Sequence, residues 1–307
     1  MPLSTPLADI DLKSLKVFCT VVECGGFGGA QVLLNKSQPA ISKHISHLEG
    51  RWGLRLCNRG RRGFSVTDDG EAVYAAAKAL FASMDDFQTR VASKTRELAG
   101  ALRVGLIDNT VTNQGSKIAT TIRQFLDRSD KLGLDLEIAS SSDLEAGVLD
   151  GSHHVAIGYF HHQLPGLRYQ PLFTESHRLY CAAEHELASI ASEDTLRARV
   201  PKARVVSVTL LTKALAEEAQ IPAREESATS PYLEAIAYML LSGKYIGYLP
   251  THYAQPWEEQ GLLKPLLPDE AKLEATCMLI TDNSKQPTNI ARAFIDDLLR
   301  NHDDRLT

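Results

Sequence analysis

The chain has 307 residues, which is enough for two or three domains and a sizeable hydrophobic core. Hydrophobic residues make up 44% and charged residues 23% of the chain, and this composition excludes a disordered or fibrous protein. No apolar run approaches the roughly 18 residues of a membrane span, and Met1 to Asp9 lacks the pattern of a signal peptide. The sequence therefore predicts a cytoplasmic protein with no membrane partner.

The formal net charge of −5 is distributed unevenly along the chain. Residues 1–67 hold nine of the 33 basic residues but only four of the 38 acidic ones, a net charge of +5. The remaining 240 residues therefore carry 24 basic and 34 acidic side chains. A basic N-terminal part on an acidic body is typical of a phosphate-binding module attached to a sensor, although random clustering would give the same totals.

The first predicted helix begins at Asp11, where apolar residues recur at spacings of three and four, and it ends at Gly25 and Gly26. A second, short helix is predicted from about Gly28 to Leu34, followed by a turn over Asn35 to Ser37. The residues that this second helix should bury are Ala30, Leu33 and Leu34. Two short helices around a tight polar turn favour a helix-turn-helix.

A third helix is predicted from about Gln38 to Trp52. Its apolar residues form one narrow seam for packing on the first two helices: Ile41, Ile45, Leu48 and Trp52. The other face carries hydrogen-bonding or cationic residues without an acidic one: Gln38, Ser42, Lys43, His44, His47 and Arg51. Ser37 is placed to cap the helix, and Pro39 suits its first turn. The same turn could enter a DNA major groove, with Gln38 reaching a base edge.

Residues 54–67 alternate apolar and polar side chains around a glycine-bounded basic tip, which predicts a β-hairpin wing. The arginines of the tip, Arg59, Arg61 and Arg62, suit the DNA backbone or a narrow minor groove. A solvated hairpin without a ligand is the alternative.

These segments together resemble the winged helix-turn-helix of LysR-type regulators. The likeness covers about the first 95 residues and is carried by Leu12–Phe18, Gly25–Phe27, Leu34–Ser42, Leu48–Glu49, Gly53–Thr67 and Asp69–Gly70. The resemblance implies that Gln38 and Pro39 face the major groove, with Ser37, Ser42 and Lys43 near the DNA. Together with the basic face and the wing, the predicted DNA-binding set is Ser37, Gln38, Pro39, Ser42, Lys43, His47, Arg51, Arg59, Arg61 and Arg62.

One departure from the family pattern lies at Gly28 and Gly29, where the family often has a hydroxyl residue and then a longer side chain. Glycine lowers helix propensity by up to about 1 kcal/mol per residue, so we expect the second helix to be weak.

A long helix is predicted from Asp68 or Asp69 to about Leu98. Its apolar residues form a heptad seam: Val73, Ala77, Leu80, Met84, Phe87 and Val91. The seam predicts self-association, with packing against the protein's own body as the alternative. The resemblance implies a homodimer through this helix, commonly a homotetramer, on an interrupted palindromic operator in double-stranded DNA. It leaves a contact with RNA polymerase open.

Beyond Gly100 the pattern alternates strands and helices, which predicts an α/β body with a mostly parallel sheet. The expected fold is α/β overall, with an all-α winged helix-turn-helix domain (residues 1–67), a linker helix (68–99) and a two-lobed α/β effector-binding domain (100–307). The first lobe should span about 100–165 and 268–307, and the second about 166–267. Residues 247–250 and 261–263 carry a looser resemblance to the family's effector-binding domain. Ser142 and Glu145 are expected to form a capping box for one helix of the body.

A small-molecule effector, an anion rather than a cation, is expected between the two lobes. The candidate residues follow predicted strands and carry hydroxyl or amide groups that can hold a carboxylate without a metal: Asn109, Thr110, Thr112, Ser140, Ser141, Tyr159, Ser207, Thr209 and Thr229. An ordinary role as a helix cap or turn residue is the alternative for each of them. The effector itself, the operator sequence and the choice between activation and repression stay open.

Two residue types invite other functions. His153, His154, His161 and His162 suggest a metal or a pH sensor, but adjacent pairs on a strand point to opposite faces, so a polar loop is favoured. The five cysteines have no metal-ligand spacing and are expected to be buried in a reducing compartment, with Cys181 and Cys277 as an alternative redox pair.

We expect a ligand-responsive transcription regulator with no cofactor and no metal. The competing function is a solute-binding or enzymatic α/β protein with a nonspecific basic head. An enzyme is disfavoured because the sequence lacks a nucleophile elbow, a phosphate-binding glycine loop, an HExxH motif and paired carboxylates in a suitable context.

Overall fold

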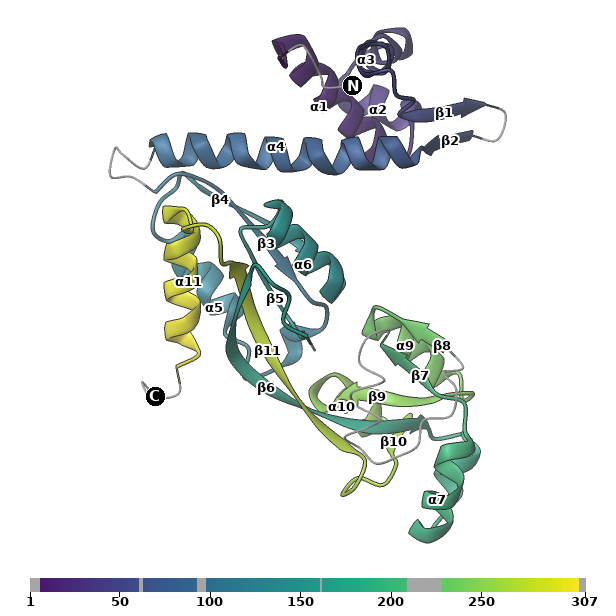
Figure 1. The fold of residues 1–307 in the computed structure, drawn as a ribbon. Helices are drawn as coiled ribbons and strands as arrows, with labels where there is room; N and C mark the ends of the chain where they lie inside the picture. Colours follow the sequence, from purple (N-terminus) through teal and green to yellow (C-terminus); the bar gives the residue numbers. More distant parts are fainter. Residues whose placement is uncertain (1–5, 61–62, 93–97, 161, 209–227, 304–307) are drawn as a thin grey trace. The chain divides into compact units, whose positions relative to one another are not determined.

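The computed structural model describes residues 6–60, 63–92, 98–160, 162–208 and 228–303 (Figure 1). The chain divides into two compact units, Met1–Gln88 with Asp150–Ser152, and Thr89–Leu149 with His153–Thr307. Within the described ranges, no helix is long and apolar enough to cross a membrane.

The first unit has the predicted order of three helices, a hairpin and a long helix (Figure 1). Its elements are α1 (Asp9–Glu23), α2 (Phe27–Leu34), α3 (Gln38–Trp52), β1 (Cys57–Gly60), β2 (Gly63–Val66) and α4 (Asp68–Ala92). The predicted seam of α3 is confirmed at Ile41, Ile45 and Leu48, which have no exposed surface. Trp52 is partly buried against the same core. The strands pair antiparallel, as expected of a wing.

Helix α2 buries Ala30 as predicted and packs Leu34 against the core, but it does not bury Leu33. Phe27 and Ala30 are buried, but Leu33 is 69% exposed and Val32 is 85% exposed. The prediction for Leu33 is wrong because the buried face passes through Phe27, Ala30 and Leu34, at spacings of three and four, and Leu33 lies outside it. The Phe27 ring also contacts Phe64 of the wing edge-on, at 5.9 Å between centroids.

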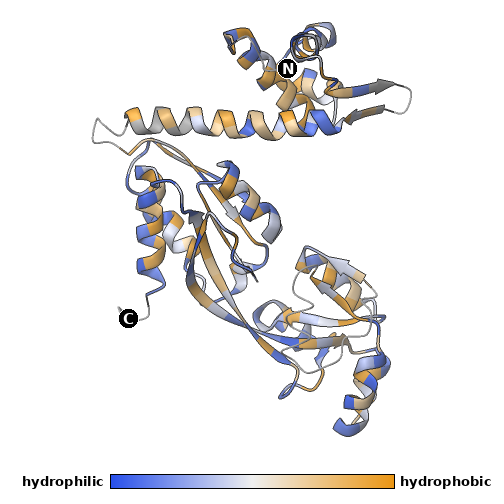
Figure 2. Cartoon of the chain, in the orientation of Figure 1, coloured by the Kyte–Doolittle hydropathy of each residue, from blue (hydrophilic) through white to orange (hydrophobic). Residues whose placement is uncertain are grey.

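The heptad seam of α4 is divided between two environments. Its N-terminal residues pack on the core of the first unit: Val73, Ala77 and Leu80. Its C-terminal residues Met84, Phe87 and Val91 are 37%, 67% and 54% exposed. Hydrophobic residues recur along the whole helix (Figure 2). The helix was expected to reach Leu98, but Leu98 is not helical, and residues 93–97 lie outside the described part of the chain.

The second unit contains a seven-stranded mixed sheet in the order β10-β6-β11-β5-β3-β4, with β9 also paired to β6. Its strands are β3 (Gly100–Leu106), β4 (Leu132–Ile138), β5 (Val155–Gly158), β6 (Leu167–Ala182), β9 (Ile246–Pro250), β10 (Leu263–Pro265) and β11 (Lys272–Asp282). The expectation of a mostly parallel sheet is wrong. Only β3 pairs in parallel, with β4 and β5, because the long strands β6 and β11 run antiparallel over most of their lengths.

The remaining elements cover this sheet or form the smaller parallel pair β7 (Val206–Val208) and β8 (Ala228–Ser230). The helices are η2 (Thr110–Thr112), α5 (Ile118–Leu126), α6 (Ser141–Asp150), η3 (Glu186–Ser189), α7 (Glu193–Arg199), η4 (Val200–Lys202), α9 (Leu233–Leu241), α10 (Thr251–Glu259) and α11 (Asn289–Asn301). The buried face of α5 is formed by Ile118, Thr121 and Phe125, and Leu126 at its end is 38% exposed.

The predicted capping box of α6 is also wrong. The Ser140 hydroxyl, rather than that of Ser142, accepts a hydrogen bond from the Asp143 amide at 3.3 Å. Glu145 instead accepts a 2.6 Å bond from the Tyr169 hydroxyl. The helix begins at Ser141, so Ser140 occupies the capping position.

Strand β6 connects separate hydrophobic cores within the second unit (Figure 1). Its Leu172 belongs to the core around β3, β5 and α11, whereas Cys181 and Tyr180 belong to two cores around β9. We call the first core lobe I and the other two lobe II. Cys277 lies in lobe I, so the two cysteines of the alternative redox pair are in different lobes. Both thiols are free, and burial raises the pKa of Cys181 to about 11 and that of Cys277 further.

Candidate DNA-binding and effector sites

The N-terminal edge of α3 is the exposed part of the predicted reading surface. Ser37, Gln38, Pro39 and Lys43 are exposed, while the seam behind them is fully buried. The Ser37 backbone has N-cap geometry, but the hydroxyl makes no capping hydrogen bond, contrary to expectation. Pro39 explains this in part, because a capping hydroxyl bonds the second or third helical N–H and proline has none. The cationic and amide groups of this edge thus point away from the core.

The C-terminal half of the predicted surface is held by α1 instead. Asp11 has no exposed surface, and its carboxylate accepts a 2.9 Å bond from His47 Nε2 and pairs with Arg51 Nε at 3.1 Å. The Asp11 pKa is lowered by the Ala8 amide at 2.7 Å and then by His47 and Arg51, against the opposing effect of burial. His44 Nδ1 lies 2.9 Å from the buried Ser14 hydroxyl. His44, His47 and Arg51 therefore connect α3 to α1 through hydrogen bonds and ion pairs.

The remaining members of the predicted DNA-binding set are Ser42 and the three arginines of the wing. Ser42 is half-buried. Arg59 lies on β1 of the wing, and nothing is described of its side chain. Arg61 and Arg62 lie outside the described residues. Among the described residues, the most exposed members of the predicted set therefore lie at the start of α3.

The predicted effector residues of lobe I lie after the carboxyl ends of strands, as expected for an α/β sheet. Asn109 and Thr110 follow β3, Ser140 and Ser141 follow β4, and Tyr159 follows β5. Ser141 and Tyr159 are brought together, because the Ser141 hydroxyl donates a 2.8 Å bond to the Tyr159 carbonyl. In lobe II, Ser207 and Thr229 are register partners on β7 and β8. Thr209 lies outside the described residues.

Sequence reasoning missed Asp108, the residue that connects the two lobes beside these positions. It follows β3 of lobe I, and its Oδ2 accepts a 2.8 Å bond from the amide of Leu233, the first residue of α9 in lobe II. The Asn109 side-chain amide donates to the same oxygen at 2.7 Å. Burial raises the Asp108 pKa, and the charge of Glu175 raises it further against these bonds. The only available signal was its position directly after a strand.

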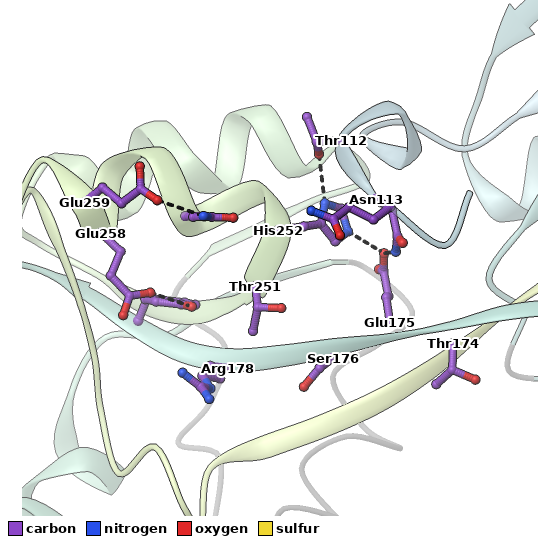
Figure 3. Close-up of a pocket in the computed structure, with 13 residues that line it drawn as sticks. Thr112, Asn113, Thr174, Glu175, Ser176, Arg178, Thr251, His252, Glu258 and Glu259 are labelled. Atoms are coloured by element: carbon purple, nitrogen blue, oxygen red, sulfur yellow. Dashed lines mark hydrogen bonds and ion pairs between the residues drawn. The ribbon is translucent and has the colours of Figure 1, made fainter. Parts of the chain in front are cut away.

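A second missed cluster centres on Glu175 of β6, beside an open cavity of about 610 Å³ (Figure 3). Glu175 is only 4% exposed and accepts hydrogen bonds from His177 Nε2 at 2.7 Å and His252 Nε2 at 2.8 Å. Asn113 Nδ2 donates to it at 3.2 Å. Burial alone would raise the Glu175 pKa, but the two imidazoles outweigh it and lower the pKa to about 2.

The Glu175 cluster also crosses between the lobes. His252 begins α10 and its Nδ1 lies 2.8 Å from the Thr112 hydroxyl, which follows β3 (Figure 3). Thr112 is the one predicted effector residue among those described as lining this cavity. The spacing of Glu175 and His177 on one strand could have placed both side chains on one face. His252, 77 residues further on, gave no comparable signal.

Two buried polar atoms near this cluster have no hydrogen-bond partner among the described residues: the Tyr159 hydroxyl and His177 Nδ1. The two rings meet edge-on, with centroids 6.5 Å apart. Burial and the neighbouring Cys277 and Glu175 raise the Tyr159 pKa. This hydroxyl therefore remains protonated.

The four histidines considered for metal binding are spread over different environments. His153 is buried, with Nε2 3.1 Å from Glu137, and His154 Nδ1 accepts a bond from the Arg103 amide. His162 is exposed, and His161 lies outside the described residues. In the described ranges, no group of three or more histidine, cysteine, aspartate or glutamate side chains is arranged to hold a metal ion.

Comparison with known proteins identifies the class. Residues 12–71 match the helix-turn-helix of the lysR family of bacterial regulatory proteins, and residues 95–303 match the LysR substrate binding domain. The chain thus belongs to the LysR family of DNA-binding transcription regulators, whose members are regulators rather than enzymes and bind DNA and small-molecule effectors. The resemblance and the α/β fold class predicted from the sequence are confirmed.

Among its relatives is the HTH-type transcriptional activator BauR of Pseudomonas aeruginosa, 35% identical, covering 94% of this chain and 95% of BauR. The nitrogen assimilation regulatory protein nac of Klebsiella aerogenes is 26% identical over 71% of this chain and 79% of nac. Full-length CbnR in complex with its target DNA has the same fold, with a TM-score of 0.66 at 19% identity, covering 95% of this chain and all of CbnR.

Proposed function

We propose that this regulator reads an interrupted palindromic operator in double-stranded DNA with the N-terminal edge of α3. The observation that carries the proposal is the contrast along this helix: Gln38 and Lys43 are exposed, whereas His47 and Arg51 are held by Asp11. Gln38 supplies the base-edge contact, Ser37 and Pro39 lie beside it, and Lys43 meets phosphate. Ser42 and the wing arginines, Arg59, Arg61 and Arg62, complete the surface.

Operator binding in the presence of competitor DNA tests this assignment. Gln38→Ala should weaken binding to the specific site by about 1–3 kcal/mol and leave nonspecific binding unchanged. Lys43→Ala should weaken binding to both kinds of DNA equally. Equal weakening on every sequence by Gln38→Ala would contradict the proposed base contact and favour the nonspecific basic head.

We further propose a homodimer through α4, assembling into a homotetramer in the cytoplasm. Support comes from Met84, Phe87 and Val91, the exposed C-terminal half of the heptad seam. Phe87→Glu should convert the dimer to a monomer in sedimentation experiments, while Ser83→Glu, at an exposed position of the same helix, should not. A dimer that persists in Phe87→Glu would assign the contact elsewhere.

We propose that a small-molecule effector binds between the lobes, at the carboxyl ends of β3, β4 and β5 and beside β7 and β8. We propose that hydroxyl groups of the candidate residues hold an anionic group of the effector. The candidates are Asn109, Thr110, Thr112, Ser140, Ser141, Tyr159, Ser207, Thr209 and Thr229. Thr110→Ala and Ser207→Ala should each reduce the thermal shift that a binding small organic acid produces. If neither variant changes the response to any acid that binds, this assignment is wrong.

A further inference from the structure

Asp108 has an unusual set of partners for a carboxylate between two lobes. Its two donors from other residues, the Leu233 amide and the Asn109 side chain, are neutral and both bond Oδ2, while the amide of Asp108 itself also stabilises the carboxylate. Oδ1 receives no hydrogen bond from another residue in the described part of the chain. Asp108 is half-buried, so its carboxylate is partly withdrawn from water.

The charges around Asp108 also lack a cation. Among the described residues none forms an ion pair with it, and the charged group that acts most on it is Glu175, another carboxylate. A carboxylate withdrawn from water without a counterion is costly, and pairing with a cation relieves that cost.

We infer that the effector carries an ammonium group that pairs with Asp108 Oδ1. This inference rests on the proposed effector site between the lobes and names the chemistry of its ligand. The Asp108 carboxylate already occupies the N-terminus of α9, the position where an anion would otherwise bind in lobe II. A ligand whose only charge is negative would be repelled there by Asp108 and Glu175. A carboxylate elsewhere in the same ligand is compatible with the hydroxyls of lobe I.

The position of Asp108 places the proposed ammonium site at a contact between the two lobes. Asp108 follows a strand of lobe I and is hydrogen-bonded to the first residue of a helix of lobe II. A bound ammonium group supplies the counterion that the Asp108 carboxylate lacks. It therefore stabilises the arrangement in which Asp108 accepts the hydrogen bond from Leu233. Binding of the amine is therefore coupled to the contact between the lobes.

Calorimetry on the full-length protein with ligands of one carbon skeleton tests the inference: butylamine, 4-aminobutyrate, butyrate and butanol. We expect binding by at least one of the two ammonium compounds and none by butyrate or butanol at the same concentration. Asp108→Asn should weaken the binding of the ammonium compound about 10- to 100-fold. Asp127→Asn, at an exposed carboxylate after α5, should leave it unchanged.

The comparison among ligands uses the wild-type protein, so it stands even if Asp108→Asn fails to fold. Binding by butyrate or butanol in preference to both amines, binding by neither amine, or an unchanged affinity in a folded Asp108→Asn protein would overturn the inference. Operator binding is measured separately without ligand. If the wild-type protein does not bind the operator, the proposed DNA site is contradicted, but the ligand result still stands.

Discussion

Each of the two units contains a buried carboxylate that pairs with two basic side chains, and the partners differ. Asp11 in the first unit binds His47 and Arg51, whereas Glu175 in the second unit binds His177 and His252. Arginine stays charged at every physiological pH, but imidazole titrates near neutrality. The contact between α1 and α3 thus includes a permanent cation, whereas both of these partners of Glu175 are imidazoles.

The two clusters also differ in what they connect. Asp11 joins two helices that share one hydrophobic core, so the apolar seam of α3 supports the same contact. Glu175, through His252 and Thr112, joins groups from different lobes with separate cores. A contact supported by a shared apolar core suits a DNA-reading helix, and a polar contact between separate cores suits lobes that respond to a ligand.

The largest expected effect comes from removing Glu175. Glu175→Ala would leave the buried imidazole of His177 and the half-buried imidazole of His252 without this acceptor, and breaking a buried pair typically costs about 3–5 kcal/mol. We expect a corresponding fall in the unfolding free energy, measured by denaturant titration. Glu274→Ala, at an exposed position of β11 in the same sheet, should change it by less than about 0.5 kcal/mol. Similar losses in both variants would show that Glu175 is not special.

The pH dependence of unfolding should follow the lowered pKa of Glu175. Because this pKa is about 2 in the folded protein against an ordinary value of 4.5, the stabilisation is complete above pH 4.5 and is lost as the pH falls toward 2. The total is about 3 kcal/mol, at 1.36 kcal/mol per unit of pKa. Glu175→Gln should flatten this part of the unfolding profile. An unchanged profile would mean that another carboxylate dominates acid unfolding.

Asp11→Asn should act on the first unit alone. It leaves Arg51 without its buried partner and should lower the melting temperature of this unit by about 5 °C. Operator affinity should fall in parallel, because the seating of α3 rather than a DNA contact is lost. Asp9→Asn, exposed on the same helix, is the matched control. Normal melting with reduced operator binding would instead place Asp11 near the DNA.

The smallest effect is expected at the two glycines of α2. A Cβ at Gly28 meets nothing within 4 Å, so Gly28→Ala should stabilise the first unit by about 0.5–1 kcal/mol. A Cβ at Gly29 would lie 2.9 Å from Cys24 Cβ and 3.0 Å from its carbonyl oxygen, so Gly29→Ala should destabilise it. Denaturant unfolding of the two variants measures the change in unfolding free energy for each. Stabilisation by both substitutions would disprove the close packing at Gly29.

Much of the first unit could be predicted from the sequence because its contacts are local. The periodicity of Ile41, Ile45 and Leu48 identified the buried seam, and Gly25, Gly26 and Pro39 marked helix ends. The failures, at Leu33 and Ser37, each depended on details of how one helix packs or begins. Periodicity assigns a buried face only approximately in a helix of eight residues.

The sequence alone determined the winged helix-turn-helix, the helix Gln38–Trp52, the long helix from Asp68 and the strands of the α/β body, because short-range periodicity encodes them. Only the tertiary structure decided the antiparallel course of β6 and β11, the fastening of His47 and Arg51 by Asp11, and the meeting of Asp108 with α9. It also brought Glu175 to His252. These contacts join residues up to 125 positions apart, where neither spacing nor composition carries a signal.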